Sequence, residues 1–170
     1  LNLEHAVTRC LSEAESLGQA LKTVMRSICE TQNWECGRYF GLDEKAGLLR
    51  FVDAWGVVDP GIERFIRESR TLTYASGVGL VGQVWQTGEA LWTEDIATDS
   101  RARKGIAREC GLHGAFMFPV LSGADTLGVL VFHSRQVRKP DARLLQAVRI
   151  IGSQVGQFLK RKQAEAVMRE

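Results

Sequence analysis

Hydrophobic positions near both ends of the chain recur with helical spacing. Two stripes alternate steps of four and three residues: Leu3, Val7, Cys10, Ala14 and Leu17 near the start, and Leu144, Val148, Ile151, Val155 and Phe158 near the end. Each stripe covers one face of an α-helix. The same steps suit a helix that pairs with its own copy. The stripes therefore predict two terminal helices with a dimer contact at Leu3, Val7, Val148 and Val155.

A second helix follows the first. Ser16 followed by Gln19 forms the pattern of a capping box, and an apolar face runs from Leu21 to Cys29. Further along, Pro60 suits the first turn of another helix, whose apolar side carries Phe65. A basic segment at 100–111 is predicted as a short helix closed by Gly111.

Short apolar runs typical of strands fill the middle of the chain. They span residues 36–42, 48–55, 90–96, 114–121 and 126–134. The polar turns "DEKAG" and "SGAD" join the first two and the last two runs. Because short turns join antiparallel neighbours, the pattern predicts an α+β fold, in which helices pack on a mostly antiparallel sheet.

Four glycines stand close together in "SGVGLVGQVWQTGE", at Gly77, Gly79, Gly82 and Gly88. A phosphate-binding loop needs Lys and Ser or Thr after its last glycine, whereas "QVW" follows Gly82. The preceding "RESRTLTYAS" is too polar for the central strand of a dinucleotide fold. We therefore expect these glycines to turn the chain into a short helix at 80–88. Gly82 would let that helix approach the sheet, and Gly88 would end it in a left-handed cap.

Composition fits one soluble domain. The 170 residues are 45% hydrophobic and 25% charged with a net charge of +2, which favours neither nucleic acid nor a membrane surface as partner. No apolar run has the length of a membrane span, and no signal pattern opens the chain. The four cysteines (Cys10, Cys29, Cys36, Cys110) lack metal-site spacing, so reduced thiols, no bound metal and a cytoplasmic location are expected.

An ordered set of motifs resembles the GAF domain, a small-molecule-sensing module of signalling proteins. The set comprises "SGVGLVGQVWQTGEALWTEDIATDSR", "AREC-GLHGAFMFPVLSGADTLGVLVFHSRQ" and "PDARLLQAVRIIGSQVGQFLKRKQAE". The resemblance runs from about Leu17 to about Lys162. It implies a GAF domain at 17–160, an N-terminal signalling or linker helix at 1–16, and a C-terminal linker helix at 161–170 that leads to an output domain outside this sequence.

The resemblance implies a five- to six-stranded sheet with the first and last helices on one face and a ligand pocket on the other. It also implies a non-catalytic sensor that relays a signal through dimerising helices to an output domain, such as a histidine kinase of a two-component system or a diguanylate cyclase. Alternatives are a ligand-free dimerisation module and a redox or chromophore sensor based on Cys110. The ligand and any cofactor stay unknown.

Known variants of the family fit the residues poorly. The motif set of cyclic-nucleotide-binding members cannot be assembled around Asp43 and Glu44. Bilin-binding members attach the pigment to a Cys followed by His, whereas here Cys110 and His113 are separated by two residues. A haem would need His113 or His133 as axial ligand. The cysteines lack the clustering of the family's methionine sulfoxide reductases.

Aromatic residues on the predicted strands are the candidates for an apolar pocket with a few polar groups. The predicted ligand-binding residues are Tyr39, Trp55, Val81, Trp92, Asp95, Cys110, Phe116 and Phe118. Each aromatic residue taken alone also fits an ordinary core. Phe116 and Phe118 should share one face of their strand, with Ala115 on the other. Asp95 also suits a capped turn, and Asp99 with Arg101 suits a turn at the start of a helix.

Overall fold

The computed structural model describes residues 2–102 and 105–169 of the chain. Its helices are α1 (Leu3–Glu13), α2 (Leu17–Gln32), α3 (Pro60–Ser69), α4 (Gly79–Thr87), α5 (Ile106–Glu109) and α6 (Ala142–Arg169). Its strands are β1 (Cys36–Asp43), β2 (Leu48–Gly56), β3 (Thr73–Tyr74), β4 (Leu91–Thr93), β5 (Gly114–Ser122) and β6 (Asp125–Ser134).

The strands form one six-stranded sheet in the order β3-β2-β1-β6-β5-β4. Every pair of neighbours is antiparallel, which confirms the predicted α+β class. The hairpins β1–β2 and β5–β6 follow the predicted turns, and β1 lies beside β6 at the centre. The sequence pattern missed β3, because two residues show no periodicity.

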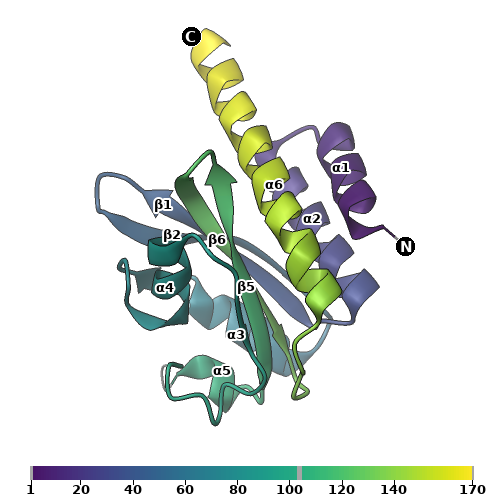
Figure 1. The fold of residues 1–170 in the computed structure, drawn as a ribbon, viewed down its shortest axis with the longest axis vertical. Coiled ribbons are helices and arrows are strands. Elements are labelled where there is room, and N and C mark those ends of the chain that lie inside the picture. Colours follow the sequence, from purple (N-terminus) through teal and green to yellow (C-terminus); the bar gives the residue numbers. More distant parts are fainter. Residues whose placement is uncertain (1, 103–104, 170) are drawn as a thin grey trace.

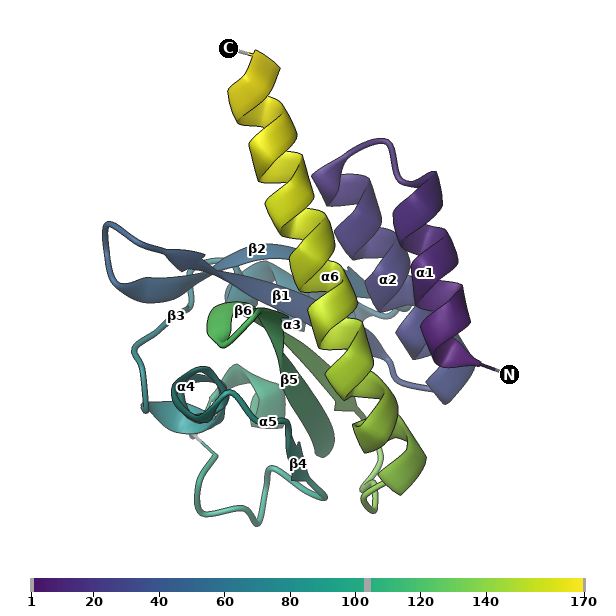
Figure 2. The ribbon, with the colours of Figure 1, turned by 45° about the horizontal axis from the view of Figure 1, so that its top comes forward.

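The two faces of the sheet carry different helices (Figures 1 and 2). Helices α1, α2 and α6 pack together over one face, and α3, α4 and α5 lie over the other. The C-terminal part of α6 projects beyond the sheet. Two glycines of α6 bring this helix close to β5: a Cβ at Gly152 would collide with the carbonyl oxygen of Pro119, and one at Gly156 with that of Leu121. The helix backbone therefore packs directly on the backbone of β5.

Helix α1 packs against the rest of the domain, on α2 and α6. Its apolar positions Leu3 and Val7 are buried in the same core as α2 and α6. The predicted capping box opens α2: Ser16 Oγ accepts the Gln19 N–H at 3.1 Å, although the Gln19 side chain accepts from the N–H of Glu15 at 2.8 Å and not from that of Ser16. Helix α1, which lies in the segment predicted as a signalling or linker helix, thus contributes Leu3 and Val7 to the core of the fold.

The glycine-rich stretch shapes the backbone as expected. Gly77 and Gly79 have φ angles of 79° and 68°, which lead the chain into α4, and Gly88 ends this helix with a φ of 68°. Gly82 is closely packed, but against the carbonyl of Ala75 and not against the sheet. The glycines therefore fold the segment back on itself.

The basic segment at 100–111 is helical over a shorter range than predicted. The helix α5 covers Ile106–Glu109, and Gly111 follows it with a φ of 76°. Residues 103 and 104, which the prediction included, lie outside the described part. Within 2–102 and 105–169, no helix has both the length and the apolarity that a membrane crossing requires.

Candidate functional site

Alternation along the central strands divides their side chains between two cores. On the face covered by α2 and α6 lie Tyr39 of β1, Phe116 and Phe118 of β5, and Phe132 of β6. Their neighbours along the strands point to the other face, which α3, α4 and α5 cover: Cys36, Phe40, Ala115, Met117, Val129 and Val131. The second face leaves room beside its side chains.

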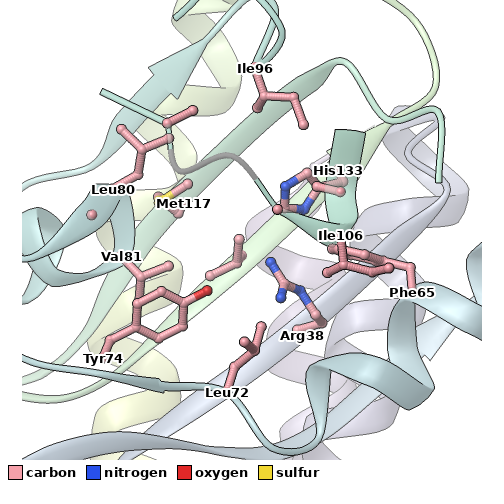
Figure 3. A pocket seen from close by; sticks show the side chains of 15 residues that line it. Arg38, Phe65, Leu72, Tyr74, Leu80, Val81, Ile96, Ile106, Met117 and His133 are labelled. Atoms are coloured by element: carbon pink, nitrogen blue, oxygen red, sulfur yellow. The ribbon is translucent and has the colours of Figure 1, made fainter. Parts of the chain in front are cut away.

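A cavity of about 200 Å³ lies on this second face (Figure 3). It is bounded by the sheet and by segments from α3 to α5. Its lining residues are Arg38, Phe65, Leu72, Tyr74, Gly79, Leu80, Val81, Ile96, Ala102, Gly105, Ile106, Ala107, Met117, Val131 and His133. The walls are mainly aliphatic and aromatic, which is typical of small-molecule sites.

Arg38 of β1 points into this cavity (Figure 3). Its side chain is 3% exposed, and Nη1 donates to Ser69 Oγ at 3.1 Å. The guanidinium carbon lies 4.4 Å from the ring centre of Phe65 and 5.0 Å from that of Phe40, so two aromatic faces lie beside the charge. Nε has no hydrogen-bond partner. No carboxylate in the described part of the chain forms an ion pair with Arg38.

His133 of β6 faces the same cavity (Figure 3). It is 5% exposed, and its ring lies edge-on to Phe65 with 5.1 Å between the ring centres. Nδ1 has no hydrogen-bond partner. Burial, reinforced by the nearby Arg38 charge, lowers the pKa of His133 well below its usual value of 6.5. The imidazole is therefore neutral at pH 7.

Of the predicted ligand-binding residues, Val81 lines the cavity, in the first turns of α4. The aromatic residues do not. Tyr39, Phe116 and Phe118 are buried in the core beneath α2 and α6, and Trp55 and Trp92 pack against that core. The rings of Phe116 and Phe132 stack with 4.9 Å between their centres. The alternation of side chains along β5 was predicted correctly. The face that carries its aromatic residues, however, is the packed core and not the cavity.

Asp95 and Cys110 lie outside the residues that line the cavity. Asp95 Oδ1 accepts the Ala97 N–H at 2.9 Å, which is the predicted capped turn, and lies 2.9 Å from His113 Nδ1. The hydrogen bond with His113 lowers the pKa of Asp95. Cys110 follows α5 and is partly exposed, and burial raises the pKa of its thiol. A raised pKa reduces the thiolate fraction and with it the nucleophilicity of Cys110.

The Asp99 and Arg101 pair has the expected local role. Asp99 accepts the backbone N–H of Arg101 at 2.9 Å and forms an ion pair with its guanidinium at 2.7 Å. These contacts with Arg101 lower the pKa of Asp99. Both residues lie outside the cavity lining, so the pair stabilises a turn.

The four residues predicted as a dimer contact are buried within their own chain. Leu3, Val7, Val148 and Val155 belong to the core between the terminal helices and the sheet, and each is at most 6% exposed. The helical spacing of the apolar residues in α1 and α6 therefore reflects the packing of these helices on each other and of α6 on the sheet. The four residues leave no surface for a second copy, which corrects the prediction.

Sequence reasoning missed Arg38 as a site residue and considered His133 only as a haem ligand. The signal for Arg38 was present: it is the one charged residue in the apolar run "CGRYFGL" of a central strand. A charge at such a position is rarely buried without a functional or structural reason. Tyr74 and Leu72, in and before β3, also belong to the lining and have no recognisable motif.

A single antiparallel sheet, with a small apolar cavity on one face and terminal helices on the other, defines a domain of the α+β class. The sequence profile of the GAF domain matches residues 14–160, so the chain belongs to the GAF domain family. GAF domains are typical of signalling and sensor proteins. No curated protein sequence matches the chain.

Solved structures of GAF domains share this fold. The GAF domain of a phosphoenolpyruvate-protein phosphotransferase from Coxiella burnetii superposes with a TM-score of 0.81 at 19% identity, over 97% of this chain and 95% of that one. The A. aeolicus nlh2 GAF domain, in an inactive state, superposes with a TM-score of 0.73 at 20% identity, over 95% of both chains. Free methionine-R-sulfoxide reductase from Neisseria meningitidis superposes with a TM-score of 0.75 at 14% identity, over 95% of this chain and 91% of that one.

Proposed function

We propose that this GAF domain is a non-catalytic sensor that binds a small molecule in the cavity lined by Arg38 and His133. The observation that carries the proposal is the cavity itself. It combines apolar walls with two buried polar side chains that have unpartnered nitrogens. Buried polar groups are normally satisfied, so unpartnered ones in a cavity indicate a missing ligand or water.

The size of the cavity selects among the ligand classes of the family. An apolar cavity of about 150 Å³ holds benzene, so about 200 Å³ corresponds to a ligand of roughly six to ten non-hydrogen atoms. A bilin or a haem is several times larger. His133 is buried beside the Arg38 cation, which disfavours it as an axial haem ligand, and Cys110 does not line the cavity. We therefore favour a small metabolite as ligand.

The signal would leave through β5 and α6. Met117 of β5 lines the cavity, and the adjacent Phe118 and Pro119 contact α6 on the other face. A ligand that binds two positions of β5 and α6, relative to the rest of the domain, with different affinity would shift the balance between them. The projecting end of α6, where Val167 is 71% and Met168 87% exposed, would then carry the homodimer contact and lead to an output domain such as a histidine kinase or a diguanylate cyclase.

A cavity-filling variant tests the proposal. Val81→Phe adds a ring where Val81 lines the cavity, and Val167→Phe places the same ring on the exposed end of α6. Native mass spectrometry of the protein as purified should show a small molecule on the wild type and on Val167→Phe, but not on Val81→Phe. A thermal-shift screen of small metabolites should give the same pattern. Equal binding by all three proteins would place the ligand elsewhere and contradict the proposal.

A further inference from the structure

The cavity has an unbalanced positive charge. A guanidinium stays protonated in proteins, and that of Arg38 is almost fully buried. Its one hydrogen-bond acceptor among the described residues is the neutral hydroxyl of Ser69. An unpaired buried charge is strongly unfavourable, and the faces of Phe40 and Phe65 offset only part of that penalty. The site is therefore short of one negative charge.

Two polar side chains from neighbouring strands line the same cavity. Arg38 and His133 lie on β1 and β6, which are paired through Cys36 opposite His133 and Arg38 opposite Val131. Arg38 Nε and His133 Nδ1 both lack a partner. In addition, the first turn of α4, at Gly79 and Leu80, lines the cavity, and the positive end of a helix dipole favours an anion.

The described part of the remaining lining carries no second charge, which favours a ligand with a single charge. Among the described residues that line the cavity, Arg38 is the only cation and no carboxylate is present. The other walls are mainly apolar, including Leu80, Val81 and Met117. A ligand with two or three charges would leave at least one unbalanced in a site of low dielectric constant, whereas an inorganic anion would leave the apolar walls without contacts.

From this arrangement we infer that the cavity binds a small organic monocarboxylate, whose carboxylate pairs with Arg38 and whose hydrocarbon part lies against α4 and β5. This inference rests on the proposed sensor function and names its ligand class. Arginine is suited to the role, because its planar N–H groups can hold both oxygens of a carboxylate. The imidazole of His133, which has one N–H when neutral, lines the same cavity and would be a second donor to the bound carboxylate.

Matched pairs of probes separate charge from shape. Benzoate and benzamide differ little in size, as do isovalerate and isovaleramide, and both fit the cavity volume. We expect isothermal titration of the full chain to show binding of both carboxylates and affinities weaker by about tenfold or more for the amides. Acetate and nitrate, which lack the hydrocarbon part, should also bind at least about tenfold more weakly than benzoate.

Variants of Arg38 test the position of the charge. Arg38→Met should lose the preference for benzoate over benzamide, and Arg38→Lys should retain part of it. Arg143→Met, an exposed arginine on α6, serves as control and should bind as the wild type does. The unliganded Arg38→Met protein should melt no lower than the wild type, because Ser69 Oγ still donates to the carbonyl of Phe65 at 2.7 Å and the unpaired charge is gone.

The outcomes distinguish this inference from the sensor function. Equal affinities of the wild type for acid and amide would contradict the inference that the ligand is a carboxylate. So would an Arg38→Met protein that still prefers benzoate over benzamide. Neither result would contradict the proposal that the cavity binds a small molecule. Tightest binding of nitrate would overturn the organic part. If Arg38→Met does not fold, the preference for acids over amides, measured in the wild type and in Arg38→Lys, tests the inference instead. If only neutral compounds bind and Val81→Phe abolishes their binding, the sensor function stands and this inference fails.

Discussion

The two faces of the sheet are built from the same strands but are packed differently. Under α2 and α6, the rings of Phe116, Phe118 and Phe132 stack nearly parallel, and none of the three lines the cavity of the other face. Under α3, α4 and α5, aliphatic side chains surround an open volume that contains Arg38 and His133. The first face is filled by stacked rings, and the second gives up close packing and charge balance around the proposed binding site.

Placing a charge in the filled face should have the largest effect. Val148→Asp puts a carboxylate in the α6 core, where Val148 is 0% exposed, and should lower the free energy of unfolding by about 4 kcal/mol or more. Ile150→Asp, two residues away and 47% exposed, should change it by less than about 0.5 kcal/mol. Chemical denaturation followed by circular dichroism measures both. A folded Val148→Asp protein of wild-type stability would contradict the conclusion that this face of the sheet is the closely packed one.

The same truncation on both faces should give unequal losses. Val148→Ala should destabilise the protein by about 2 kcal/mol, because closely packed neighbours lose their contacts. Val81→Ala should change stability by less than about 0.5 kcal/mol, since Val81 borders empty volume and has fewer contacts to lose. Both residues lie in helices, so the gain in helix propensity cancels in the comparison. Equal losses in denaturation curves would mean that the cavity side is as closely packed as the other.

The pH dependence of stability should be the smallest effect. Because the pKa of His133 is lower in the folded state than its usual 6.5, the unfolded chain binds the proton more readily below that value. Stability should therefore be fully present above pH 6.5 and fall as the pH decreases from there towards the folded-state pKa, by about 1 kcal/mol in the first unit. Comparing unfolding at pH 7.5 and 5.5 for the unliganded protein measures this loss.

Two variants isolate the contribution of His133. His133→Gln removes the titrating group and should show a smaller loss between the two pH values. His5→Gln, which changes an exposed histidine of α1, is the matched control for the substitution itself. A His133→Gln protein with the full wild-type loss would contradict the burial of a neutral imidazole at this site.

The sequence predicted much of the fold, because periodicity and turn chemistry are local. The stripes of the terminal helices, the two hairpins, the turn into α4 and the split between Phe116 and Ala115 on β5 are all confirmed. A local pattern does not indicate which face of the sheet holds the cavity. Both faces of β5 are apolar and both are covered by helices, so aromatic content pointed to the face that is in fact filled.

The binding residues were harder to predict, for a related reason. The importance of Arg38 depends on the absence of a partner, and that depends on residues of α3 that are distant in sequence, such as Ser69. Likewise, the apolar steps at Val148 and Val155 suit both a coiled coil and packing on a sheet. The glycines Gly152 and Gly156 of the same helix, which pack directly on the backbone of β5, decide for the sheet.

Those two glycines have a mechanical consequence. Side chains between a helix and a strand can change rotamer and absorb a small displacement, but backbone in contact with backbone has no such freedom. We therefore expect β5 and the middle of α6 to move as one rigid lever. Because α6 continues past the edge of the sheet, a small tilt at Gly152 is amplified into a larger sideways travel at the far end of the helix (Figure 1).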